Sequence, residues 1–217
     1  DADRADVAWR RCFLARMVGD AEAAFREGTR AIALGERAGD APLACRVHHE
    51  LVLLHADHGR FAEAREHARR AAALLEGRAH PWLEARGLGT EAYVHLAEGR
   101  PLDALPLLEE SARGFARVGD RQREAVALYN AGVCSADLGR LAEARELVER
   151  AAEVAGRVRY VRTGVAARGM LAGLDWIEGR PDAGAALDQA VTDGERAGHL
   201  RVAAEAVRLN RVRSLLT

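Results

Sequence analysis

Apolar residues recur along most of the chain at steps of three or four positions, the spacing that places them on one face of an α-helix. In residues 61–76 this apolar stripe consists of Phe61, Ala64, Ala68, Ala71 and Leu75. No stretch shows the strict alternation of apolar and polar positions that is typical of a half-buried strand. The pattern therefore predicts an all-α fold.

Short turns separate the helical stretches and recur at a constant interval. A glycine followed by a polar residue occurs at Gly19, Gly59, Gly99, Gly139 and Gly179, so consecutive turns are 40 residues apart. Glycine suits the position after a helix because it adopts positive φ without steric cost. A constant period of about 20–50 residues is the sequence signature of a helical-repeat solenoid.

Each period accommodates two helices joined by a tight turn, which form one helical hairpin. We expect five such hairpins to stack as a single domain, residues 1–217, because repeats of this kind bury a continuous core. They are predicted over residues 1–40, 41–80, 81–120, 121–160 and 161–199, with a capping helix over 200–217.

Prolines mark several of the expected helix starts. Pro42, Pro101 and Pro181 lie where the first turn of a helix tolerates proline. Pro106 lies beyond the first turn of its helix, where the ring removes a backbone donor. It therefore predicts a kink or a late helix start.

Composition and charge narrow the classes of function. The 217-residue chain has a formal net charge of −1, which argues against direct nucleic-acid binding because such surfaces are normally basic. Aromatic residues make up only 5% of the chain, so the core is expected to consist of alanine, leucine and valine. All 32 basic residues are arginine, which fits either a GC-rich genome or the selection of arginine for carboxylate or phosphate recognition.

The cysteines and the ends of the chain bear on its location. Cys12, Cys45 and Cys134 are odd in number and far apart, so they form neither a metal-binding motif nor a disulfide framework. Reduced thiols and a cytoplasmic location are expected. No signal peptide and no apolar run of about 20 residues is present, so we expect no membrane association.

Because Asp1 begins in helical register without a methionine, we expect the chain to be a fragment of a longer protein.

The positions of small residues within the period resemble the tetratricopeptide repeat family. In the fourth hairpin the family's signature spacing is matched by Leu128, Gly132, Gly139, Ala144 and Ala151, and its first-helix motif by Tyr129 and Asn130. Small residues let the backbones of neighbouring helices approach closely. The fifth hairpin departs most, because Gly184 and Val191 stand at alanine positions. The usual repeat of this family has about 34 residues, so longer helices are expected here.

Arrays with a 40-residue period resemble the sensor region of large ATP-dependent regulators of the LuxR and maltose-activator type, the STAND proteins of high-GC bacteria. The resemblance implies a right-handed α–α superhelix in which the first helix of each hairpin lines a concave groove. It also implies a receptor for an inducer or a partner protein, with the ATPase and DNA-binding parts outside this chain. This step is an analogy of fold.

The resemblance places the candidate binding residues on the first helices. Aromatic and arginine side chains contribute most to many protein interfaces. Asn130 could hydrogen-bond the backbone of an extended peptide, and Arg46 or Arg86 could hold a carboxylate with two hydrogen bonds. In the alternative interpretation, Tyr93, Tyr129 and Trp176 pack between hairpins. The complete candidate set is Trp9, Arg10, Phe13, Arg46, His49, Glu50, Arg86, Tyr93, Tyr129, Asn130, Met170 and Trp176.

Histidines crowd the second hairpin, in the segment HHELVLLHADH. His55 and His58 are three residues apart with Asp57 between them, which raises the question of a metal site. Such a site needs three or four convergent ligands, and no HExxH motif is present. We therefore interpret these residues as core or surface histidines and expect no metal. His67, on the following helix, is expected to be exposed.

No catalytic motif emerges from the chain. Ser111, Ser135 and Ser214 lack the sequence context of a nucleophile elbow, and the glycines mark turns rather than a phosphate-binding loop. We expect no enzymatic activity and no cofactor. Three functions stay open: a scaffold that binds a protein or peptide in the groove, a sensor that binds a small-molecule inducer near Trp176, and a homo-oligomerisation module, for example a homodimer, that uses the helix over 200–216.

Overall fold

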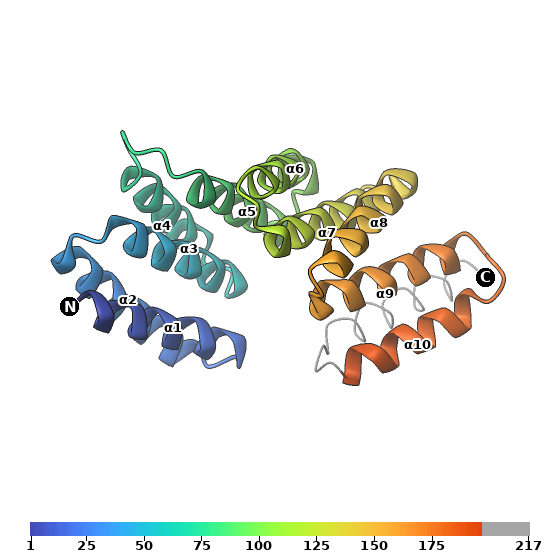
Figure 1. Cartoon of the computed structure of the whole chain (residues 1–217), viewed down its shortest axis with the longest axis horizontal. Helices are drawn as coiled ribbons and strands as arrows, with labels where there is room; N and C mark the ends of the chain where they lie inside the picture. Colours follow the sequence, from blue (N-terminus) through green and yellow to red (C-terminus); the bar gives the residue numbers. More distant parts are fainter. Residues whose placement is uncertain (197–217) are drawn as a thin grey trace. The chain divides into compact units, whose positions relative to one another are not determined.

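The computed structural model describes residues 1–196, and within this range every regular element is a helix (Figure 1). The predicted all-α helical-repeat fold is thereby confirmed. The described residues form two compact units, which divide between Gly114 and Phe115. The capping helix predicted over 200–217 lies outside the described residues. None of the helices within 1–196 combines the length and the apolar character needed to cross a bilayer.

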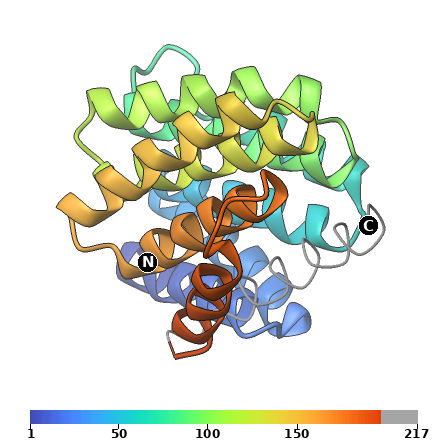
Figure 2. The ribbon, with the colours of Figure 1, turned by 90° about the vertical axis from the view of Figure 1, so that its right-hand side faces the viewer.

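The first unit consists of consecutive helical hairpins. Helices α1 and α2 lie side by side, as do α3 and α4, and α3 packs on both α1 and α2 just as α5 packs on both α3 and α4 (Figures 1 and 2). The helices are α1 (Ala2–Met17), α2 (Ala21–Ala38), α3 (Ala41–Asp57), α4 (Phe61–Ala73), α5 (Pro81–Ala97) and α6 (Pro101–Arg117). The last three residues of α6 belong to the second unit.

The second unit continues the same plan. Helix α7 packs on α8, and α9 packs on α7, α8 and α10. These helices are α7 (Arg121–Asp137), α8 (Leu141–Arg157), α9 (Val161–Ile177) and α10 (Ala183–Arg196).

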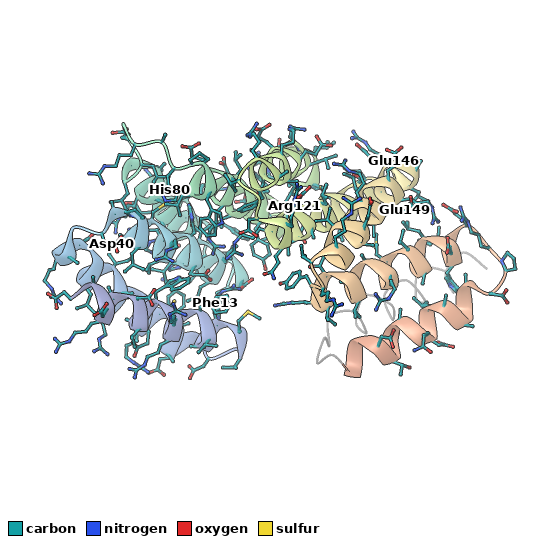
Figure 3. The ribbon with its side chains drawn as sticks, in the orientation of Figure 1. Phe13, Asp40, His80, Arg121, Glu146 and Glu149 are labelled. Carbon is teal, nitrogen blue, oxygen red and sulfur yellow. The ribbon has the colours of Figure 1, made fainter. Side chains whose placement is uncertain are left out.

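The turns follow the glycine spacing that the sequence shows. All five period-marking glycines have φ between 68° and 82°, the left-handed region that disfavours other residues. Aspartates then begin the next helix: the carboxylates of Asp20 and Asp40 each accept a hydrogen bond of 2.9 Å from the backbone N–H three residues on. His80 caps α5 in the same way through Nδ1, at 3.4 Å from the N–H of Leu83; Asp40 and His80 are labelled in Figure 3.

One turn has a strained residue where two others have glycine. Arg159 adopts a φ of 52°, and the equivalent positions one and three periods earlier are Gly119 and Gly39, with φ of 76° and 68°. We expect Arg159→Gly to raise the free energy of unfolding by about 0.5–1 kcal/mol, since glycine removes the left-handed strain at some cost in unfolded-state entropy. Urea denaturation measures this change, and an unchanged or lower stability would contradict it.

Two helix boundaries and the late start of one helix differ from the prediction. Helix α4 ends at Ala73 instead of near residue 76, and α10 begins at Ala183 instead of Pro181, because Asp182 has a φ of 65° that no α-helix contains. Helix α6 starts at Pro101 and runs through Pro106, so the late start is wrong. A proline at this position removes a single backbone hydrogen bond, and the remaining bonds hold the helix.

Small residues set the distance between helices. Ala144 and Ala151 are fully buried, and a Cβ added to Gly132 would overlap Cγ2 of Val148 and lie 3.2 Å from the carbonyl oxygen of Ala144. Helices α7 and α8 therefore touch through their backbones, as the small-residue spacing predicts. In the third hairpin Ser111 takes the last small position, and its hydroxyl donates a 2.7 Å hydrogen bond to the carbonyl oxygen of Ala85.

Candidate functional site

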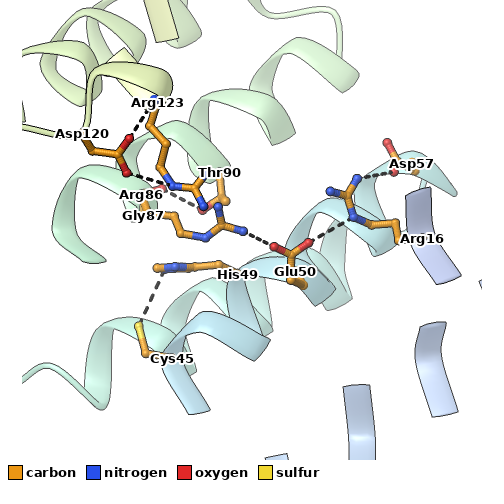
Figure 4. A network of polar contacts seen from close by, with 10 residues as sticks. All are labelled: Arg16, Cys45, His49, Glu50, Asp57, Arg86, Gly87, Thr90, Asp120 and Arg123. Carbon is orange, nitrogen blue, oxygen red and sulfur yellow. Dashed lines mark hydrogen bonds and ion pairs between the residues drawn. The ribbon is translucent and has the colours of Figure 1, made fainter. Parts of the chain in front are cut away.

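A row of charged side chains links the first helices of the hairpins in the first unit. At its centre is Glu50 of α3, whose side chain is only 3% exposed. Its carboxylate accepts a hydrogen bond of 3.2 Å from Nε of Arg16 on α1 and another from the guanidinium of Arg86 on α5 (Figure 4). Two arginines from different helices thus contact one buried carboxylate. These contacts restrict the side-chain conformations of Glu50 and of both arginines.

A second acidic residue extends this row. Asp57 of α3 lies 3.8 Å from the guanidinium of Arg16 and accepts a hydrogen bond from the hydroxyl of Tyr93 on α5. Glu50 and Asp57 are seven residues apart, as are Arg86 and Tyr93, so each pair lies on one face of its helix. We call these five residues the α1–α3–α5 network.

An aromatic contact joins α1 and α3 near this network. The guanidinium of Arg46 lies 4.6 Å from the ring centroid of Trp9, and that of Arg10 lies 5.8 Å from it, both within the range of a cation–π interaction. Arg10 is also paired with Asp6 at 2.6 Å. Phe13, on the same helix, is one of the exposed large apolar residues of the unit (Figure 3).

His49 lies next to Arg86 of the network (Figure 4). It is buried, and its Nε2 is 3.9 Å from the sulfur of Cys45. Burial, and to a lesser extent the positive charge of Arg86, lower the pKa of His49 to about 3. His49 is therefore neutral at physiological pH and supports Arg86 from the core side.

The candidate residues of the second unit lie mostly among packed side chains. Met170 is buried in a core cluster with Ala144, Val148, Ala167 and Leu174, and Tyr129 packs against this cluster. The ring of Trp176 packs against α10, since a Cβ added to Gly184 would lie 2.7 Å from it. Asn130 is half-buried on α7.

Sequence reasoning named part of this arrangement. Glu50, Arg86 and Tyr93 were candidates, and the structure brings them into one network. Arg16 and Asp57 were missed as members of it. The seven-residue spacing that Glu50–Asp57 shares with Arg86–Tyr93 was the available signal, because it places two polar residues on one face of each helix.

A histidine cluster lies between α3 and α4. Nδ1 of His48 and Nδ1 of His67 are 2.8 Å apart, and the ring of His55 stacks on that of His67 at 5.1 Å. The prediction that His67 is exposed is wrong, because these two residues of α3 cover it to half-burial. One Nδ1 donates and the other accepts, so at least the accepting ring is neutral. Within residues 1–196, no three His, Cys, Asp or Glu side chains come together as metal ligands.

The histidine cluster makes stability depend on pH. Burial is the main cause that lowers the pKa of His48 and of His67 to about 4, with positive charge from Arg70 and from the neighbouring histidines adding to it while Glu66 opposes it. The unfolded chain binds these protons near pH 6.5, so stability is complete above that pH and is lost as the pH falls toward about 4.

Between pH 7 and pH 5 we expect the pair to lose about 1–2 kcal/mol of stability, a figure reduced for the half-exposure of His67. Urea unfolding at both pH values measures the loss. The variant His67→Gln should lose clearly less over the same interval, and an equal loss would contradict the assignment.

The fold defines a class of protein, the α-helical repeat proteins built from stacked hairpins. Residues 83–157 match the family model described as the tetratricopeptide repeat, which confirms the resemblance seen in the sequence. No curated protein matches the chain.

Solved structures share the fold over almost the whole chain. Aspartyl phosphate phosphatase F from Bacillus subtilis is similar over 95% of this chain, with a TM-score of 0.75 and 14% identity. A STAND protein with a tetratricopeptide repeat sensor, from Pyrococcus horikoshii, is similar over 95%, with a TM-score of 0.76 and 14% identity. A Rap protein complexed with competence and sporulation factor is similar over 99%, with a TM-score of 0.74 and 13% identity. The chain spans 54%, 31% and 65% of these three proteins, respectively.

Proposed function

We propose that this chain is a non-catalytic scaffold that binds a protein or peptide partner on the first helices of the first unit. The observation that carries the proposal is the α1–α3–α5 network, in which buried Glu50 and exposed Asp57 hold two arginines and a tyrosine in place. Arginine and tyrosine are enriched among the residues that dominate binding energy. Side chains that are ordered before binding lose less conformational entropy on binding.

The wider setting is a further part of the proposal. The STAND protein from Pyrococcus horikoshii carries a tetratricopeptide repeat sensor, and a Rap protein of the same fold was solved with a bound factor. By analogy with these proteins, we assign the chain to the repeat region of a larger cytoplasmic bacterial regulator. Its partner would be a protein or peptide rather than nucleic acid.

Selection of binders from a displayed random-peptide library tests the binding surface. Peptides that bind the chain are measured by isothermal titration against the double variant Arg46→Ala/Tyr93→Ala. We expect at least a tenfold loss of affinity with an unchanged helical circular dichroism signal. Each substitution removes a large side chain from the proposed binding surface on the first helices. Arg26→Ala, on the exposed side of α2, is the matched control and should bind as the parent does.

Undiminished affinity in the double variant would refute the assignment to the first unit. If binding were lost in the double variant Tyr129→Ala/Asn130→Ala and kept in Arg46→Ala/Tyr93→Ala, the binding site would lie in the second unit. A thermal-shift response to one metabolite, with no peptide selected, would favour the inducer sensor instead.

A further inference from the structure

The first helix carries an exposed apolar face. Val7, Leu14 and Val18 are 49%, 59% and 80% exposed, although valine and leucine are usually buried. Their spacing of seven and four residues places them on one side of α1 and its C-cap. Three neighbouring apolar residues on one exposed side mark an interaction surface more often than single ones do.

The 40-residue period identifies the residues that stand at the equivalent positions in the next hairpin, and their packing can be compared. Val47 and Leu54 of α3 stand one period after Val7 and Leu14, and both are buried. They pack against the preceding hairpin: Val47 lies in a cluster with Ala5, Ala8, Ala31 and Leu34, and Leu54 lies in a cluster with Ala24.

The position of Leu14 is also buried in two later hairpins. Val94 of α5, two periods after Leu14, packs with Val52, Ala56 and Ala64 of the hairpin before it. Leu174 of α9, four periods after Leu14, packs with Ala144 and Val148 of α8. In α3, α5 and α9, therefore, this register position contacts the preceding hairpin, and in α1 it is exposed.

The helix that receives this face is lined with small residues. In the first hairpin α2 presents Ala24, Gly28 and Ala31 to α3, and a Cβ on Gly28 would lie 2.8 Å from the side chain of Leu51. One period earlier the residue equivalent to Leu51 is Arg11, which is exposed. A helix that packs on α1 in the same way therefore needs small residues at the positions equivalent to Ala24, Gly28 and Ala31. It also needs a carboxylate within reach of Arg11.

We propose that the face formed by Val7 and Leu14, which Val18 adjoins, is a docking surface for one more α-hairpin of the tetratricopeptide type, whose second helix has an alanine- and glycine-lined face and an acidic group. The surface is distinct from the α1–α3–α5 network, and the inference does not depend on the proposed peptide-binding function. It continues the interface that α3 makes with the first hairpin and α5 makes with the second.

The test supplies such a hairpin in the correct register. A copy of residues 1–40 is fused ahead of residue 1 of the full chain, which keeps the 40-residue period, and the copied α2 can then face α1 as α2 faces α3. Glu27 of that copied helix supplies an acidic side chain beside the position of Gly28. Leu14→Cys is introduced in the original part of both proteins, and its labelling by a maleimide is followed. The three native cysteines are buried, so their labelling in the folded chain is slow.

We expect Leu14→Cys to react at least tenfold more slowly in the extended protein than in the parent chain. Leu102→Cys, at an exposed position of α6, is the matched control and should react at equal rates in both. With Leu14→Glu present and Val7→Cys as the reporter, the protection of the extended protein should disappear.

Equal rates for Leu14→Cys in the two proteins would overturn the proposal. Protection that appears in the parent chain as its concentration rises would assign the face to self-association instead, and would also overturn it. A large loss of stability from Leu14→Glu in the parent chain would show that the face is already covered there.

Discussion

Glu50→Gln is expected to lower the free energy of unfolding by about 2–4 kcal/mol. The carboxylate is almost completely buried and is shared by Arg16 and Arg86, whose side chains are largely buried too. Removing one charge from such a group leaves the other charges without their compensating partner, at a cost that reaches about 3–5 kcal/mol in fully buried pairs. The partial exposure of both arginines reduces the expected figure.

Urea denaturation of the full chain at pH 7 measures this effect. Glu22→Gln is the matched control, because Glu22 is exposed and its contact with Arg26 is 3.6 Å long, so no measurable change is expected. In a double-mutant cycle, Glu50→Gln combined with Arg86→Gln should cost less than the sum of the single variants, because the two residues interact. Additive losses would mean that the Glu50–Arg86 contact contributes nothing to stability.

Gly132→Ala is expected to destabilise the chain by about 1–3 kcal/mol, although alanine is a better helix former than glycine. The new methyl group would overlap Val148 and approach the carbonyl oxygen of Ala144, and forcing extra atoms into a packed interface costs about this much. The backbone of α8 has to move away from α7, or Val148 has to leave its position in the core.

Gly156→Ala provides the comparison. It lies in α8 with no atom within 4 Å of the added Cβ, so the gain in helix propensity, up to about 1 kcal/mol, should be observed there without a packing cost. Opposite signs for the two variants are the expected result in thermal or urea unfolding. A stabilising Gly132→Ala would show that α7 and α8 are not in backbone contact.

Most of the fold could be predicted from local sequence. The glycines that end helices and the aspartates that begin them act within a few residues, so Gly19 and Asp20 mark their boundary without tertiary information. The start of α10 was misplaced because Pro181 alone suggests a helix start, whereas the left-handed conformation of Asp182 delays it. Its backbone angle depends on how the turn closes, which the residue types do not reveal.

Less of the candidate site could be predicted. The sequence names Glu50 and Arg86 as candidates on the first helices, but their pairing depends on the stagger between neighbouring hairpins. Residues 36 positions apart in sequence meet there, and no local pattern specifies such a contact. His67 was misassigned for the same reason: a helical wheel of α4 does not show that His48 of α3 lies opposite it.

The shared carboxylate has a consequence for how the first unit opens. In a stack of repeats each hairpin normally interacts with its nearest neighbours, and the ends can fray one hairpin at a time. Glu50 instead binds arginines from the hairpins on both sides of its own, so detachment of α1 removes one of the two charges that balance it. Detachment of α1 also exposes Glu50 to water, which weakens its remaining ion pair with Arg86 on α5, and native-state hydrogen exchange should show the amides of α1 and α5 opening as one cooperative group.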